Sequence, residues 1–395
     1  MVQIKYGEKK IDYLYLFLFV MVGQLSVFFF KKILGGYDPI LMTFEKLMFV
    51  AFFSIVCLLN LKKAFTVVAF YLVYIVFSMF LSAFKGVDSN VIFYQMLHEL
   101  KLFLFLPVIY LSIDNKDIHK YLVAIIKVVA VLSSLLLILR VVSSGFYDSV
   151  FPGGSHHEKA FLGGFVLDRY VGIFWHPSQT SIVIGLSLFY FALIREKIYW
   201  MLMLSGILLL TFQKLEIFCV CLMVVATYVD RNTILRYKKI ISAVVIILMN
   251  IVIYVVIQSD EVSPRALVFK EAFVYLQDSN YIGNGWGVIG SHAAADINRV
   301  YDYNYLSDLW WAKDGKFLYD TYWPHVYAES GAIGFLLLMF TFLLLSIKAV
   351  GVYGYLVILF LLVSSVFSSN LLALPFLIVF AFYYAVCVGY EKNNF

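Results

Sequence analysis

The chain has 395 residues, of which 63% are hydrophobic and only 14% are charged. Soluble globular proteins are about 45 to 50% apolar and about 25% charged, so this composition excludes an ordinary soluble domain and predicts an integral membrane protein. The net charge of +5 comes mostly from basic residues between the apolar runs, so it gives no reason to expect nucleic-acid binding.

Apolar runs close to the length of about 20 residues that crosses a bilayer recur along the sequence. We expect helices, because lipid cannot satisfy free backbone polar groups and the runs are too long and continuous for barrel strands. The sequence therefore predicts one all-α, polytopic transmembrane domain over residues 1–395. The twelve expected spans are residues 11–30, 40–59, 64–84, 91–113, 121–143, 179–194, 198–212, 214–229, 240–258, 326–346, 350–364 and 369–388.

Basic residues gather in alternate connections between these spans. They include Lys5, Lys9, Lys10, Lys62, Lys63, Lys116, Lys120, Arg195, Lys197, Arg231, Arg236, Lys238, Lys239, Lys348 and Lys392. By the positive-inside rule these connections are cytoplasmic, which puts both termini in the cytoplasm, although Lys31 and Lys32 depart from the pattern. No small-residue cleavage site follows the first span, so we expect it to stay as an uncleaved anchor.

Two segments on the opposite side interrupt the spans, residues 144–178 and residues 259–325. The second separates the ninth and tenth spans and has 67 residues, a length typical of functional or disordered loops. Its aromatic content argues against disorder. Within it, Pro264 suits a first helical turn and apolar residues recur at helical spacing, which predicts a helix over residues 264–278.

Four of the six tryptophans lie in this long loop. Aromatic faces beside carboxylates and amides suit a sugar, which has apolar CH faces and many hydroxyls. The alternative is the aromatic belt found at membrane interfaces. The candidate sugar-binding residues are Trp286, Trp310, Trp311, Tyr322 and Trp323.

Arg169 begins the pattern RxxGxFxxP at the outer end of the sixth span. A guanidinium group can bind two phosphate oxygens at once, which lysine cannot do. The alternative is an arginine that extends to the lipid headgroups. His176, within the same pattern, is expected only to support the turn.

A second arginine, Arg265, opens the predicted helix, and Gly283, Gly285 and Gly287 follow it. Alternating glycines permit a tight backbone path near a ligand, but no strand precedes them, so they do not predict a dinucleotide site.

Asp320, His325 and Glu329 lie where the long loop returns to the membrane. His325 and Glu329 are four residues apart and would share one face of a helix. A histidine or carboxylate here could act as a general base. His325 could instead cap a helix or lie at the interface.

Several charged or titratable residues fall inside predicted spans, where arginine or lysine costs about 2.5 to 3.5 kcal/mol. We expect them to face a water-filled cavity or each other. They are His98, Glu99, Lys101, Lys127 and Arg140. The four cysteines lie in apolar spans and are expected to pack there. No metal-binding or nucleotide-binding motif is present, so the sequence predicts chemistry without a metal ion or cofactor.

These motifs resemble those of the O-antigen polymerase and ligase family over residues 160–345. Arg169, Gly172, Phe174 and Pro177 match its first arginine motif, with Ser178 where asparagine is usual. SPRALVFKEA and GNGWG resemble its second arginine motif, with Phe269 where tryptophan is frequent.

The end of the loop matches this family less closely. Asp320 has the register of the family's His or Asp, but Thr321 follows in place of asparagine, while Glu329 and Gly334 match. The base stays open between Asp320 and His325. In TFQK, Lys214 stands in place of the family's arginine.

The resemblance implies a GT-C-like glycosyltransferase on the periplasmic face of the bacterial inner membrane. Its donor would be an oligosaccharide linked through pyrophosphate to undecaprenol, and its other partners would be membrane lipid, a chain-length regulator and a flippase. Arg169, Arg265 and Lys214 would bind the pyrophosphate. Asp320 or His325 would accept the proton of the acceptor hydroxyl, and Glu329 is the third candidate in the catalytic set.

Polymerase activity on lipid-linked repeat units is the first expectation, because a compact, Phe- and Tyr-rich chain with an aspartate in the terminal register resembles the polymerases of this family more than its ligases. A ligase would use the same donor but transfer the polymer to lipid A core. A lipid-linked oligosaccharide flippase is the alternative outside enzymes, and it predicts charges along a central path through the spans.

Overall fold

The structure of the protein is a computed structural model. Helices make up most of the residues that it describes. The structure describes residues 20, 22–27, 29–30, 33, 39–113, 116–151, 159–162, 165–170, 172–174, 176–259, 263–302, 305–309, 312, 321–366, 371 and 374–394. Side chains in lipid-facing helices need no polar partners, whereas their backbone groups are paired within each helix.

Five helices in this described part of the chain are long and apolar enough to cross a membrane. They are Asn60–Phe84, Ser89–Tyr110, Lys116–Val142, Arg231–Gln258 and Trp323–Lys348. Shorter apolar helices include Pro177–Leu193, Ile198–Leu210 and Val352–Ser364. A helical protein with a membrane location is therefore supported by length and composition, whereas the count of twelve spans stays a prediction.

The chain divides into two compact units. The first comprises Met1–Phe52, Ser112–Ile217 and Gly389–Phe395, and the second comprises Phe53–Leu111 and Phe218–Val388. The first arginine motif therefore belongs to the first unit, and both the second arginine motif and His325 belong to the second.

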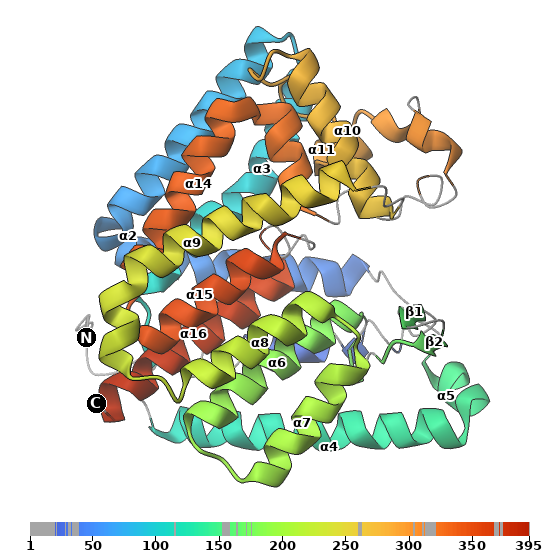
Figure 1. Cartoon of the computed structure of the whole chain (residues 1–395), viewed down its shortest axis with the longest axis vertical. Helices are drawn as coiled ribbons and strands as arrows, with labels where there is room; N and C mark the ends of the chain where they lie inside the picture. Colours follow the sequence, from blue (N-terminus) through green and yellow to red (C-terminus); the bar gives the residue numbers. More distant parts are fainter. Residues whose placement is uncertain are drawn as a thin grey trace. The chain divides into compact units, whose positions relative to one another are not determined.

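In the first unit, α4 (Lys116–Val142) packs against α5 (Ser144–Val150), α6 (Pro177–Leu193) and α7 (Ile198–Leu210), and α6 packs on α7 (Figure 1). The strands β1 (Lys159–Leu162) and β2 (Phe165–Asp168) pair antiparallel, with Lys159 opposite Asp168. This hairpin is an exception to the expected all-α class. It lies in the segment 144–178, for which the sequence predicts only a loop.

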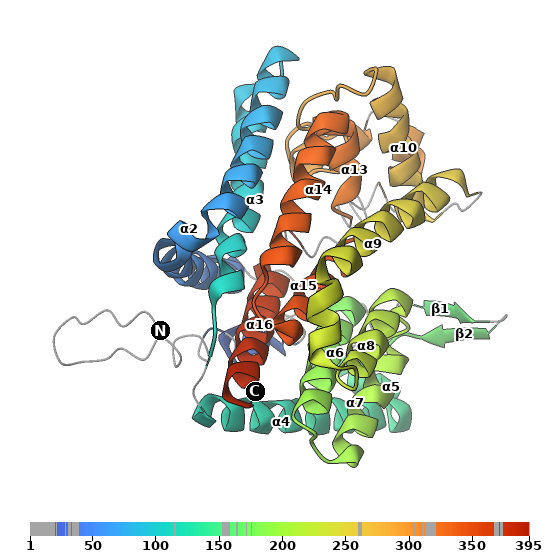
Figure 2. The same ribbon diagram turned by 60° about the vertical axis from the view of Figure 1, so that its left-hand side comes forward.

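The second unit contains the larger part of the helices (Figures 1 and 2). Its contacts join α9 (Arg231–Gln258) to α10 (Pro264–Asp278), α14 (Gly331–Lys348) and α15 (Val352–Ser364), and α3 (Ser89–Phe105) to α11 (His292–Asp296). The remaining elements are η1 (Leu106–Tyr110), η2 (Val300–Asp302), η3 (Tyr305–Asp308), α13 (Trp323–His325) and η4 (Val326–Ser330). Three helices extend over the boundary between the units, α2 (Pro39–Phe84), α8 (Lys214–Ala226) and α16 (Leu374–Asn394).

Two sequence predictions about helix limits have different outcomes. The helix expected over residues 264–278 is confirmed as α10, and its cap is the Ser263 side chain, which accepts the Ala266 N–H at 3.4 Å. The break expected between residues 59 and 64 is wrong, because α2 continues through it. The intervening residues are Asn60, Leu61, Lys62 and Lys63, with no glycine or proline, so no helix-breaking residue ends the helix there.

Candidate functional site

The polar centre of the second unit is the carboxylate of Glu99, which lies inside α3 and is fully buried. Its Oε1 accepts hydrogen bonds from Gln95 Nε2 at 3.0 Å and from His325 Nε2 at 3.2 Å. Its Oε2 accepts from the hydroxyl groups of Tyr71 at 2.6 Å and Tyr322 at 3.2 Å. Four donors around two oxygens are the environment that a buried carboxylate requires.

His325 lies at the end of α13 with 1% of its surface exposed. Because the Glu99 carboxylate only accepts hydrogen bonds, His325 Nε2 carries the proton of their shared bond. This tautomer leaves Nδ1 as the ring nitrogen that can take up a proton. A carboxylate that orients an imidazole in this way is an arrangement that supports general-base chemistry.

The segment after His325 is a π-helical turn, η4. Single π-helical turns are rare and occur frequently at functional sites. The spacing of His325 and Glu329 predicts that they share one face of an α-helix, whereas in this π-helical turn the Glu329 carboxylate bonds to the glycine-rich segment. Its Oε1 accepts the backbone N–H groups of Gly287 at 2.9 Å and Val288 at 2.9 Å.

The glycine-rich segment beside Glu329 has positive φ angles, which glycine adopts more readily than other residues. Gly283, Gly285 and Gly287 have φ angles of +99°, +83° and +87°. The tight path predicted from their spacing is confirmed. The group that it surrounds in the structure is the carboxyl group of Glu329, a part of the same chain.

Replacing Gly283 with alanine should destabilise the second unit by about 1 to 3 kcal/mol, because φ is positive and a side chain has no space. An added Cβ would lie 2.7 Å from both the Glu329 carbonyl oxygen and the Gly331 nitrogen. Thermal unfolding in detergent measures this loss. Gly206→Ala is the matched control, since it lies within α7 with nothing within 4 Å of an added Cβ, and it should leave stability unchanged or raise it slightly.

Arg265 lies in the first turn of α10 and is half-buried. α10 packs against α13 and η4, the two elements that hold His325 and Glu329 (Figure 2). Val268 and Ala272 of α10 share an apolar cluster with Ile289 and Ala328. This packing brings the second arginine motif, the glycine segment and the return segment together within one unit.

Arg169 precedes α6 in the first unit and is half-buried. Its carbonyl oxygen accepts a hydrogen bond from Arg140 Nη1 at 3.0 Å, and the hydroxyl of neighbouring Tyr170 donates to the Ser133 carbonyl. Gly172 adopts a φ of +56°. The turn is thereby fixed to α4, while the expected meeting of Arg169 with Arg265 stays a prediction.

His176 caps the start of α6, because its Nδ1 accepts the Ser178 N–H at 3.1 Å, and Pro177 occupies the first helical position. The supporting role expected for His176 is therefore confirmed. Lys214, the third candidate for pyrophosphate binding, is the exposed first residue of α8.

The aromatic candidates that the structure describes lie inside the second unit. Trp286 and Trp323 are fully buried, and Tyr322 is 1% exposed. Trp323 Nε1 donates to Ser365 Oγ at 3.3 Å. These contacts make the rings part of the packing, and their contact with a sugar stays a prediction. Asp320, Trp310 and Trp311 lie outside the described residues.

A second polar cluster joins α3 to α11. Lys101 Nζ donates to His98 Nδ1 at 2.9 Å, and the rings of His98 and His292 stack with centroids 4.0 Å apart. Burial, with additional effects of His98 and Lys101, lowers the pKa of His292 to about 2, so this imidazole is neutral. In the first unit, Lys127 and Glu196 form an ion pair of 3.3 Å. The expectation that titratable groups in the spans face each other is confirmed for His98 and Lys101, whereas Glu196, the partner of Lys127, lies between two predicted spans.

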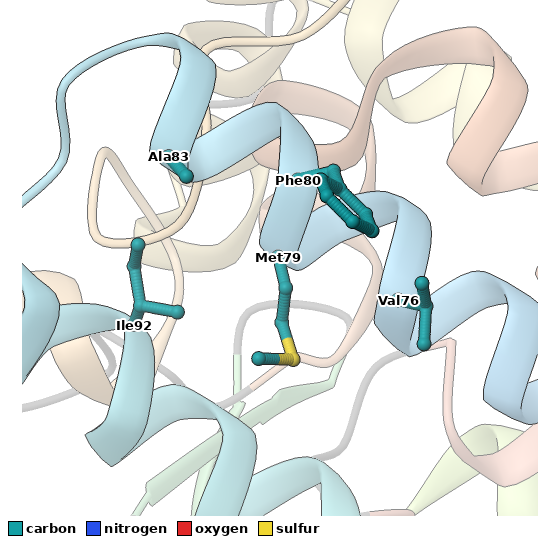
Figure 3. A pocket seen from close by; sticks show the side chains of 5 residues that line it. All are labelled: Val76, Met79, Phe80, Ala83 and Ile92. Carbon is teal, nitrogen blue, oxygen red and sulfur yellow. The ribbon is translucent and has the colours of Figure 1, made fainter.

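An apolar groove lies between α2 and α3, with a volume of about 360 Å³ (Figure 3). It is lined by Val76, Met79, Phe80, Ala83 and Ile92. Its lining has no charged group. On α2, the groove is close in sequence to Ser82, whose hydroxyl accepts the Trp286 N–H at 2.8 Å. The groove therefore adjoins the helix that supports the glycine segment.

No known protein family, curated protein or solved structure matches this chain. The site is consequently defined by its own geometry. No group of three or more His, Cys, Asp or Glu side chains that could hold a metal ion occurs among the described residues.

The sequence predicts that Glu99 is a costly charge in a span but does not indicate a role in the site. It does not predict its hydrogen-bond partners Gln95 and Tyr71 either. Gln95 and Glu99 are four residues apart, a spacing that places both on one face of a helix, so this part of the site had a sequence signal. The bond between Glu99 and His325 joins residues 226 positions apart and had none.

Proposed function

We propose that the protein is a polymerase that joins undecaprenyl-pyrophosphate-linked oligosaccharide repeat units into O-antigen or a related surface polysaccharide. The observation that carries the proposal is the buried Glu99–His325 pair, packed in the same unit as the helix that begins with the second arginine motif. This combination supplies a proton acceptor and a cation for a departing diphosphate.

In the proposed reaction, a hydroxyl oxygen of the acceptor repeat unit attacks the anomeric carbon of the donor sugar. The bond between that carbon and the pyrophosphate oxygen breaks, and undecaprenyl pyrophosphate leaves. His325 Nδ1 takes the hydroxyl proton, and Glu99 stabilises the imidazolium that forms. Arg265 stabilises the charge that develops on the leaving group. Binding of the pyrophosphate by Arg169 and Lys214, which belong to the first unit, stays a prediction.

The proposal includes a membrane arrangement. Twelve spans in a GT-C-like fold would place both termini in the cytoplasm and the site on the periplasmic face of the inner membrane. The undecaprenyl chain would lie along the spans, and the apolar groove between α2 and α3 is a candidate place for part of it.

The test is elongation by the purified protein in detergent or vesicles, supplied with lipid-linked repeat units, with and without a chelator. A ladder of lengthened products supports the proposal. Arg265→Ala should lower kcat/KM by about 10²–10³-fold, because it removes a preorganised cation from the leaving group, and Arg265→Lys should recover only part of it. Arg236→Ala, at an exposed arginine of α9, is the control. An unchanged rate in Arg265→Ala would contradict the role of Arg265.

Other functions give different outcomes. A ligase transfers polymer to lipid A core and leaves polymer on undecaprenol when its gene is deleted, whereas loss of a polymerase leaves single repeats on core. A flippase mutant traps lipid-linked repeats inside. The pairing of Lys127 with Glu196 and of Glu99 with His325 favours enzyme over flippase, since these charges are satisfied within the protein.

A further inference from the structure

One oxygen of the Glu329 carboxyl group accepts hydrogen bonds from several neighbouring donors, most of them backbone N–H groups. Its Oε1 accepts three successive backbone N–H groups, from Gly287 at 2.9 Å, Val288 at 2.9 Å and Ile289 at 3.3 Å, and the Ser291 hydroxyl at 2.7 Å. The side chain is fully buried. Successive N–H groups that converge on one point form a concavity of the kind that binds anions, and here the carboxyl group of Glu329 occupies it.

Further backbone bonds fix the glycine segment to the turn that carries Glu329. The N–H groups of Asn284 and Gly285 donate to the carbonyl oxygens of Ala328 and Glu329, both at 3.0 Å. Gly290 lies close to the segment that carries His325. A Cβ added to Gly290 would be 3.0 Å from the backbone nitrogen of His325. The position of the glycine segment and the position of His325 are therefore coupled by direct packing.

The end of the glycine segment is also linked to Glu99, through α11 and Gln95. Ser291 caps α11, and the N–H group of Ala293 in α11 donates to Gln95 Oε1 at 3.3 Å. Gln95 in turn donates to Glu99 at 3.0 Å, and Glu99 orients His325. A continuous set of hydrogen bonds thus runs from Glu329 through the glycine segment and Gln95 to the Glu99–His325 pair.

We infer that Glu329 is a positioning residue, not a member of the catalytic set in which the sequence analysis placed it. Its carboxylate holds residues 287–291 in place, and that segment fixes His325 against Glu99. The inference rests on the proposed function for its effect on activity, but its effect on the backbone of residues 287–289 is independent of that function.

Two substitutions separate positioning from proton transfer. Glu329→Gln keeps an oxygen acceptor for the N–H groups but cannot transfer a proton as a carboxylate does. It should leave KM unchanged and lower kcat by no more than about tenfold, whereas a general acid or base would lose about 10²–10⁴-fold. Glu329→Ala removes the acceptor and should speed amide hydrogen exchange at residues 287–289 by about 100-fold, because the hydrogen bonds of three N–H groups are lost together.

Asp278→Asn, at an exposed carboxylate on α10, is the control and should change neither kcat nor exchange. If Glu329→Gln loses kcat as strongly as His325→Gln while exchange at 287–289 stays slow, Glu329 takes part in the chemistry and the inference is overturned. Unchanged exchange in Glu329→Ala also overturns it, whatever the activity. Absence of elongation by the unmodified protein would instead count against the proposed function alone.

Discussion

His325→Gln is expected to lower the elongation rate by about 10²–10⁴-fold, the usual contribution of a positioned general base. Glutamine can still donate an amide N–H to Glu99, so the buried carboxylate keeps a donor at this position. It has no nitrogen that can accept a proton at neutral pH. The loss should therefore appear in kcat, with the fold and the affinity for the lipid-linked donor preserved.

Single-turnover elongation by purified protein measures this effect, and thermal unfolding shows whether the variant remains folded. His119→Gln is the matched control, because His119 is a half-buried histidine of the first unit that bonds to Tyr190 at 2.6 Å. If His325→Gln elongates at more than about a third of the normal rate, His325 is not the base. Asp320 would then be the remaining candidate from the sequence.

Features set by neighbouring residues were predictable from the sequence. α10 begins and ends where Ser263, Pro264 and the apolar spacing place it, since caps and periodicity act within a few residues. The positive φ angles at Gly283, Gly285 and Gly287 follow from the same local logic. The hairpin of β1 and β2 also has a local signal in the sequence, two short apolar runs on either side of Gly163 and Gly164.

Features set by distant residues were not predictable in this way. The cost of a charge in a span indicates that Glu99 has a partner, but it does not identify His325 as that partner. The π-helical turn of η4 is another example, since its sequence also suits an α-helix. In this turn Glu329 bonds to the glycine segment, about 40 residues earlier in the chain, and the periodicity of the sequence does not reveal such a contact.

Glu99→Ala is expected to destabilise the second unit by about 3 to 5 kcal/mol, because it leaves several buried hydrogen-bond donors without an acceptor. The imidazole of His325 and the hydroxyl groups of Tyr71 and Tyr322 would lose their shared partner, and none is exposed to water. Glu99→Gln keeps one oxygen acceptor and should cost about 1 to 3 kcal/mol. Unfolding in mixed micelles of increasing denaturing detergent measures both changes.

The first unit offers the control for this prediction. Glu196 pairs with Lys127 at 3.3 Å, but their side chains are 16% and 32% exposed, so water can replace the lost partner. Glu196→Ala should therefore cost no more than about 1 kcal/mol. Equal losses for Glu99→Ala and Glu196→Ala would contradict a desolvated Glu99. Because Glu99→Gln keeps the fold but no longer provides a negative charge beside His325, its kcat should fall more than its folded fraction, which separates orientation of the base from stability alone.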